Sequence, residues 1–482
     1  MTIASPSLPS TRLKALRQFN PLLVAALLCA LQVLATWPGE LTDDSREQLH
    51  QALTGSYADW HPPIMALVWS WLLKLGRGPG SLLLLHQALH WLGFGLIADG
   101  CRRSERHREA WLVLLAGAFP IFLFYDRIVI KDVGMANALV AGAGIALWFI
   151  LQRRRVPFWA LLLSALCIAY GTLIRTNAIF AIAPLLLLYR VQGRTFSYVQ
   201  ILMCAVLTAL LALPLSNWIN HRLIGARPQY PLQSLQIFDL MGIAVRAHDA
   251  AVFGPAGPTL EAVQSCYTPY WWDPVSPWGS CPQLRQTLGF TSNIDTSPPQ
   301  AVAATAQLWR TAILHHPWAY LLHRLEYFNA SEYFLVPAYA FRYSKAADIA
   351  PYGSRVISRQ TIILDYVRVN VLCWPVFWAS LGACLLALLG GTKDIAPEAA
   401  LARLLTSSGL LYSGGYFLVG VATDIRYHYW CAMCVLISLI LVAPVLGPQL
   451  RAAPGAARRA LAVMGIIVVL GYAARIADIP LL

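Results

Sequence analysis

Acidic and basic side chains recur in short turns between the apolar segments of this 482-residue chain. The first such turn, residues 41–64, contains the adjacent acids Asp43 and Asp44. An aspartate beside a reacting centre can accept a proton from an attacking hydroxyl or bind a metal ion. An aspartate just before a helix can instead cap its amino end, so one of the two acids has a structural alternative. The turn therefore predicts a catalytic carboxylate, either Asp44 or Asp43.

The same turn ends in His61-Pro62-Pro63. Two prolines fix the backbone and suit the start of a helix, which would hold His61 at the helix amino end. A single histidine is most often structural or solvated. Its acidic neighbours upstream favour a role for His61 in substrate contact or metal ligation.

Three later turns each combine a cation with other polar residues. They contain Asp126, Lys131 and Asp132, then Arg175 beside Asn177, and finally Asp424, Arg426, Tyr427 and His428. Arginine and lysine suit phosphate oxygens and can stabilise the charge that develops on a leaving phosphate. We therefore expect Lys131, Arg175 and Arg426 to bind a donor phosphate. We expect substrate contacts from His61, Asp132, Asp126, Tyr427 and His428. For the turn at 126–132 the alternative is a local salt bridge that ends two helices.

The composition places these turns in a membrane protein. Hydrophobic residues make up 58% of the chain and charged residues 12%, against about 25% charged residues in soluble proteins. Repeated apolar runs predict an all-α polytopic fold with about eleven transmembrane helices. They lie near 20–38, 80–100, 110–125, 133–151, 157–174, 177–190, 198–217, 369–390, 401–422, 429–447 and 460–476. The net charge of +13 sits mostly in short tracts between these runs, which indicates topology signals rather than a nucleic-acid partner.

The short apolar segment 62–76 decides the predicted topology. It has too few residues to span a bilayer, which takes about 20. If it does not cross, the basic tracts at 12–17, 102–108, 153–155, 190–194, 393–403 and 451–459 share one side, the cytoplasmic one by the positive-inside rule. Every polar turn then faces outward. We expect segment 62–76 to lie at the outer interface, anchored by Trp69 and Trp71.

These assignments divide the chain into four parts. They are a disordered cytoplasmic segment 1–19, an N-terminal transmembrane catalytic module 20–216 with its first outer loop 39–79, a periplasmic loop domain 217–368, and C-terminal transmembrane helices 369–482. Cys266 and Cys281 stand apart from the other cysteines, in the long polar loop. In an oxidising compartment they predict a disulfide, with two free thiols as the alternative.

The turns resemble the GT-C superfamily of membrane glycosyltransferases, which use polyprenyl-phosphate-linked sugars and include protein mannosyltransferases and aminoarabinose transferases. The resemblance rests on Asp43-Asp44, where many relatives have Asp-Glu, on His61-Pro62-Pro63, where several have Lys-Pro-Pro, and on Asp132 and Arg426-Tyr427. It covers roughly residues 20–200 and the turn at 424–430. It implies that Asp43 or Asp44 is the base, that Lys131, Arg175 and Arg426 contact the lipid phosphate, and that the displacement is inverting.

The expected protein is thus a bacterial inner-membrane glycosyltransferase with a periplasmic active site. Its partners would be a polyprenyl-phosphate sugar, the bilayer, and a glycan, lipid or protein acceptor. The histidine at position 61 is a less suitable phosphate ligand than the family's lysine, and no cofactor is assigned, a divalent metal staying possible. The alternatives are a lipopolysaccharide or O-antigen polymerase or ligase, and a transporter or flippase, which would need ionisable residues inside the bilayer. The sequence leaves open the sugar, the acceptor and the oligomeric state.

Overall fold

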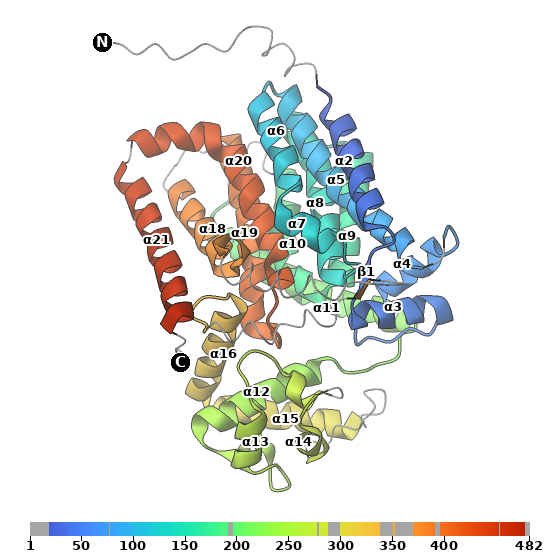
Figure 1. The fold of residues 1–482 in the computed structure, drawn as a ribbon, viewed down its shortest axis with the longest axis vertical. Coiled ribbons are helices and arrows are strands. Elements are labelled where there is room, and N and C mark those ends of the chain that lie inside the picture. Colours follow the sequence, from blue (N-terminus) through green and yellow to red (C-terminus); the bar gives the residue numbers. More distant parts are fainter. Residues whose placement is uncertain are drawn as a thin grey trace.

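The computed structural model describes residues 19–76, 78–190, 196–276, 279–287, 299–337, 350–351, 370–390, 396–452 and 454–477. These residues are mostly helical (Figure 1), and their one sheet is a short antiparallel pair of β1 (Glu40–Leu41) with β2 (Ala350–Pro351). The predicted all-α class is confirmed. The segment 1–19, predicted to be disordered, lies outside the described residues except for Phe19.

Helices occupy all eleven ranges that were predicted to be transmembrane. They are α2 (Pro21–Thr36), α5 (Gly80–Arg103), α6 (His107–Gly117) with α7 (Pro120–Asp126), α8 (Lys131–Leu151), α9 (Phe158–Ile174), η1 (Thr176–Ala178) with α10 (Ile179–Leu187) and η2 (Leu188–Arg190), α11 (Tyr198–Trp218), α18 (Pro375–Leu389), α19 (Pro397–Val419), α20 (Tyr429–Ala452) and α21 (Pro454–Ala477). Several begin at a proline, whose fixed φ and missing N–H suit the first helical turn.

Fewer than eleven of these helices are long and apolar enough to cross a membrane. Within the described residues, five are: α5, α8, α11 with its extension η3 (Ile219–Leu223), α20 and α21. A sixth results if α6 and α7, bent by 45° at their junction, count as one span. Four further apolar stretches have only 10–17 residues, and a full crossing takes about 20. The structure supports a multi-helix membrane protein. Eleven spans are not confirmed, because four apolar runs fold into helices that are too short and the 23-residue α19 is not among the helices that are apolar enough.

Helix α8 lies at the centre of the bundle, and nearly all of its residues are buried. It packs closely against α5, where both helices carry glycine. A Cβ on Gly93 would lie 2.6 Å from the carbonyl carbon of Val140, and one on Gly144 would lie 2.7 Å from the carbonyl oxygen of Gly93. Small residues allow such close helix contacts in membranes. The close packing fixes α8, whose first two residues are Lys131 and Asp132.

The predicted first outer loop forms two short helices beside the bundle, α3 (Asp43–Thr54) and α4 (Ile64–Leu72). Helix α4 has nine residues, which is too short to cross a bilayer. Trp71 is exposed, as expected of an interfacial anchor, but Trp69 is fully buried and donates its indole N–H to the carbonyl of Gly78. The prediction that both tryptophans are anchors is therefore wrong for Trp69.

A second group of helices lies below the bundle in Figure 1. It consists of α12 (Leu232–Ala247), η4 (Ala250–Phe253), α13 (Leu260–Cys266), η5 (Asp273–Val275), α14 (Pro282–Thr287), α15 (Pro299–His315) and α16 (Pro317–Ser331). These helices enclose a hydrophobic core of their own that includes Phe238, Met241 and Val263. Within the predicted domain 217–368, residues 217–223 form the end of α11 and the helix η3. Residues 277–278, 288–298, 338–349 and 352–368 lie outside the described part.

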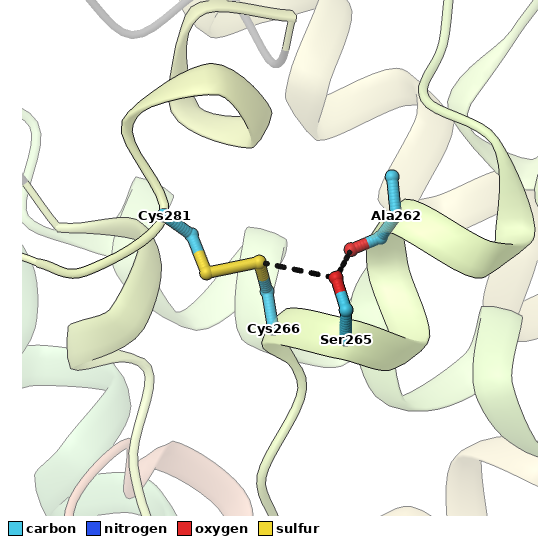
Figure 2. The surroundings of a disulfide bond; sticks show 4 residues. All are labelled: Ala262, Ser265, Cys266 and Cys281. Atoms are coloured by element: carbon cyan, nitrogen blue, oxygen red, sulfur yellow. Dashed lines mark hydrogen bonds between the residues drawn. A yellow bond between two sulfur atoms is a disulfide. The ribbon is translucent and has the colours of Figure 1, made fainter.

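A disulfide links two segments of this second group of helices. It joins Cys266, the last residue of α13, to Cys281 just before α14 (Figure 2). The predicted pairing of these two cysteines is confirmed. The remaining eight cysteines are free, and all lie buried or half-buried, as expected of small apolar side chains.

Candidate functional site

Helix α3 presents Asp44, and not Asp43, to the other polar turns. Thr42 caps the helix by accepting from the backbone N–H of Ser45, and the Ser45 hydroxyl donates to the carbonyl of Val129, just before α8. Asp43 is 71% exposed and pairs with Arg46 one turn along the helix, at 2.7 Å. Asp44 points toward the start of α8 instead. The structure thus separates the roles of the two acids that the sequence left open.

Lys131 links Asp44 to His61. Its ammonium lies 3.1 Å from Asp44 Oδ2 and 2.5 Å from His61 Nδ1. Because a lysine ammonium can only donate, His61 Nδ1 accepts, and its proton sits on Nε2. That Nε2 lies 3.6 Å from Asp44 Oδ1 and 3.6 Å from Glu47 Oε2. His61 therefore holds the lysine on one side and faces carboxylates on the other.

The electrostatics of this group keep Asp44 charged and His61 neutral. Burial alone would raise the pKa of the Asp44 carboxyl. The positive charge around it, first that of Lys131 and then that of Arg426, together with the hydrogen bond from Lys131, holds that pKa well below its ordinary value. Burial, followed by the charge of Lys131, lowers the pKa of His61 to about 3. At neutral pH the group thus contains an ionised carboxylate and an uncharged imidazole.

Asp132, the next residue of α8, forms ion pairs with two arginines from turns that are distant in the sequence. Arg175 follows α9, and its Nε lies 2.9 Å from Asp132 Oδ1. Arg426 lies in η10 (Ile425–His428), and its Nε lies 3.7 Å from Asp132 Oδ2 and 3.4 Å from Asp424. Asp132 is completely buried, while Arg175 and Arg426 keep 16% and 19% of their side chains exposed. Both arginine side chains are therefore largely but not completely buried, and the Nε atoms that face Asp132 are buried.

Aromatic rings support both arginines. Arg175 and Arg426 lie 5.1 Å and 5.2 Å from the ring centre of Tyr427, a distance at which a cation is attracted to the ring. Tyr427 in turn stacks on Tyr416, whose hydroxyl accepts a hydrogen bond from Arg175. Tyr427 was predicted at this site. Tyr416 was not, because it lies near the end of α19 with no charged residue close to it in the sequence.

The structure brings together seven of the predicted residues and leaves out three. Those gathered around the start of α8 are Asp44, His61, Lys131, Asp132, Arg175, Arg426 and Tyr427. Those outside are the exposed Asp43, together with Asp126 and His428. Glu47, one turn after Asp44 on the same face of α3, was missed, although its helical spacing from Asp44 could have revealed it.

Asp126 is a packing residue rather than a substrate ligand. Its carboxylate lies 3.1 Å from His90 and accepts hydrogen bonds from Gln32, Asn137 and Tyr429. These partners come from α5, α2, α8 and α20, and the side chain is fully buried among them. A buried carboxylate with this many partners joins helices and has no access to a substrate.

His428 is likewise enclosed. Its two ring nitrogens lie 2.9 Å from the Ser331 hydroxyl and 3.3 Å from Glu332, and Ser413 also contacts the ring. The prediction that Asp126, Asp132 and His428 bind substrate is therefore corrected, because all three side chains are buried. The sequence indicates which turn a residue occupies but not whether its side chain points into the protein.

The described residues contain no group of three or more histidine, cysteine or carboxylate side chains arranged to hold a metal ion. Comparison with known proteins found no matching family model, no matching curated protein and no matching solved structure. The functional assignment accordingly rests on the chemistry of the residues themselves. The partly exposed carboxylate of Asp44 can take up a proton. Beside it, Lys131, Arg175 and Arg426, each paired with a carboxylate, can bind an anionic group.

Proposed function

We propose that this protein is a membrane glycosyltransferase, which moves a sugar from a polyprenyl-phosphate donor to a hydroxyl of a lipid, glycan or protein acceptor. The observation that carries the proposal is the junction of Asp44, Lys131, Asp132, Arg175 and Arg426 at one end of the membrane helices. A lipid phosphate at the bilayer surface would meet the three cations there, with a carboxylate base beside them.

In the proposed reaction Asp44 takes the proton of the acceptor hydroxyl. The acceptor oxygen then forms a bond to the anomeric carbon as the bond from that carbon to the phosphate oxygen breaks. The polyprenyl phosphate leaves with the bonding electrons. Lys131, Arg175 and Arg426 stabilise its developing charge, which is the usual work of cations at a leaving phosphate.

The Asp44–Lys131 ion pair implies that the donor binds before Asp44 becomes an effective base. While the lysine faces Asp44, at 3.1 Å, the carboxylate is a weak base because the ammonium stabilises its charge. A donor phosphate that attracts Lys131 would remove part of that stabilisation and raise the pKa of Asp44. The base would then gain proton affinity only when a donor is bound.

His61 has a supporting role in this scheme. Several members of the family that the turns resemble carry a lysine at the matching position, and a neutral imidazole offers no charge to a phosphate. His61 instead accepts from Lys131 and so keeps that ammonium directed at the site. The GT-C fold, eleven membrane crossings and an outward-facing site belong to this proposal as further predictions.

The test compares Asp44→Asn with Asp43→Asn in the full-length protein in lipid nanodiscs. Release of polyprenyl phosphate is measured with a panel of polyprenyl-phosphate-linked sugars and hydroxyl acceptors. Loss of a general base lowers turnover about 10²- to 10⁴-fold, so Asp44→Asn should do so. Asp43→Asn is the matched control because it removes only an exposed ion pair, which contributes little to stability. A folded Asp44→Asn protein with wild-type turnover would exclude Asp44 as the base.

A further inference from the structure

Helix α16 connects the second group of helices to the membrane bundle (Figure 1). The helix contacts both the first residues and the last residue of the segment 420–428. This segment follows α19, precedes α20 and includes Arg426 and Tyr427 of the proposed site. The contacts come from side chains on α16 that the proposed reaction does not itself use.

On one side, α16 binds the main chain just before the site residues. Arg324 donates to the carbonyl of Gly420 at 2.7 Å, and the Tyr327 hydroxyl donates to the carbonyl of Ala422 at 2.9 Å. Both side chains are fully buried. The fit is close, since a Cβ on Gly420 would lie only 1.9 Å from the Tyr327 hydroxyl. Backbone carbonyls held by two buried donors have little freedom to move.

The Arg324 guanidinium is itself held by the second group of helices. It forms an ion pair with Asp239 of α12, and the same carboxylate lies 3.2 Å from His323 and accepts from Trp309 at 2.7 Å. A buried arginine is stable only when its charge is matched in this way. In addition, the carbonyl of Val421 accepts from the backbone N–H of Trp272 at 2.9 Å. Three consecutive carbonyls, from Gly420 to Ala422, are thus bound by this group.

The carboxyl end of α16 contacts His428, the last residue of the segment 420–428. Ser331 and Glu332 lie 2.9 Å and 3.3 Å from the two ring nitrogens of His428. The backbone between Ala422 and His428 is therefore fixed at both ends by one helix. Arg426 lies inside that interval and reaches from it to Asp132.

We propose that α16 is the positioning element for Arg426, and that Arg324 and Tyr327 are positioning residues for donor-phosphate binding. The proposal rests on the proposed function, because it assigns a purpose to the placement of Arg426. The second group of helices would then set the shape of the membrane site through hydrogen bonds to main-chain carbonyls, without touching the substrate.

The experiment compares Tyr327→Phe and Arg324→Lys with Glu326→Gln, all in the full-length protein. Glu326 lies on the same helix but pairs with Arg246 of α12, away from segment 420–428. Its substitution therefore controls for general loosening of the domain. Hydrogen exchange of the amides at 420–428 is followed by mass spectrometry, and binding of a sugar-free polyprenyl monophosphate is measured in nanodiscs.

We expect exchange at 420–428 to rise about two- to tenfold in Tyr327→Phe and Arg324→Lys, because each loses or weakens one buried hydrogen bond. We also expect their affinity for the polyprenyl phosphate to fall about tenfold, as for a misplaced cationic donor. Glu326→Gln should match the wild type in both measurements. Unchanged exchange in both test variants would overturn the proposal. So would faster exchange with wild-type phosphate affinity.

A wild-type protein that binds no polyprenyl phosphate would count against the proposed function itself. In that case, faster exchange at 420–428 in the two test variants would still support the conclusion that α16 restricts the motion of this segment. The two failures are thus distinguishable, since the exchange measurement requires no ligand.

Discussion

Asp132 is the residue on which the cationic half of the site depends. It is fully buried and faces Arg175 at 2.9 Å and Arg426 at 3.7 Å, so it is the shared counter-ion of two arginines that start from different turns. A buried ion pair adds little when compared with a well-packed apolar pair, but removal of one partner leaves the other charge uncompensated.

The substitution Asp132→Asn should therefore destabilise the protein strongly, by about 3–5 kcal/mol. Asp424→Asn is the matched control, because Asp424 pairs with the same Arg426 but is 34% exposed. Its loss should cost less than about 1 kcal/mol. Unfolding of the purified variants in mild detergent, followed by heat or denaturant, measures the difference. Equal stability of the two variants would show that Asp132 is not the counter-ion we infer.

The low pKa of His61 in the folded protein predicts how stability depends on pH. The unfolded state titrates this imidazole near its ordinary value of 6.5, whereas the folded state does so at about 3. As the pH falls below 6.5, the unfolded state takes up a proton that the folded state does not, so stability decreases with falling pH. Between pH 7 and 5 the decrease amounts to about 2 kcal/mol. Asp44 stays ionised over this range, because its pKa lies well below the ordinary value.

The matched variant is His61→Gln, which keeps an acceptor for Lys131 but cannot titrate. Stability curves of the wild type and this variant, measured from pH 7 to pH 5, should diverge as the pH falls, with the wild type losing more. Parallel curves would mean that His61 is accessible to protons in the folded protein.

At the scale of helices, the sequence predicted positions better than orientations. Long apolar runs bounded by proline and charge indicate where a helix begins and ends, and helices occupy every predicted range. A turn that contains charged residues does not reveal which of them face inward. Asp126 and Asp132 are six residues apart in one polar stretch, yet Asp126 joins a packing network and Asp132 holds the site. Likewise, Tyr427 enters the site and His428 is turned away from it. These differences arise from tertiary packing, which no local pattern encodes.

The disulfide between Cys266 and Cys281 makes a prediction for the second group of helices. Closing a loop with a sequence separation of 15 residues contributes about 3 kcal/mol in the chain-entropy model. The double substitution Cys266→Ser/Cys281→Ser should therefore increase proteolysis within α12–α16 and leave the membrane helices protected. Cys384→Ser, at a half-buried free cysteine of α18, is the control. Unchanged proteolysis in the double variant would show that the core of this group suffices without the bridge.

For the whole molecule, the site lies at one end of the bundle, and the basic residues that follow α8 and end α20 lie at the other. Helix α8 starts with Lys131 in the site and has 21 residues, so its far end lies about 30 Å away. Arg153, Arg154 and Arg155 follow that far end, and α9 then returns to Arg175 in the site. Helix α20 leaves the site after His428 and reaches Arg451. Basic residues in short loops favour the cytoplasmic side, so this separation predicts that the Asp44–Lys131 end faces outward.

Cysteine labelling tests this orientation. Asp43→Cys places a thiol on the exposed face of α3, beside the site, and Arg155→Cys places one in the exposed turn at the other end. In intact cells a membrane-impermeant maleimide should label the first variant and not the second, whereas both should react once the membrane is opened. The wild type serves as the background, because its free cysteines are buried or half-buried. The reverse pattern would put the site on the cytoplasmic side. A donor oriented outward could then not reach Asp44, and the proposed reaction would need a substrate presented from inside the cell.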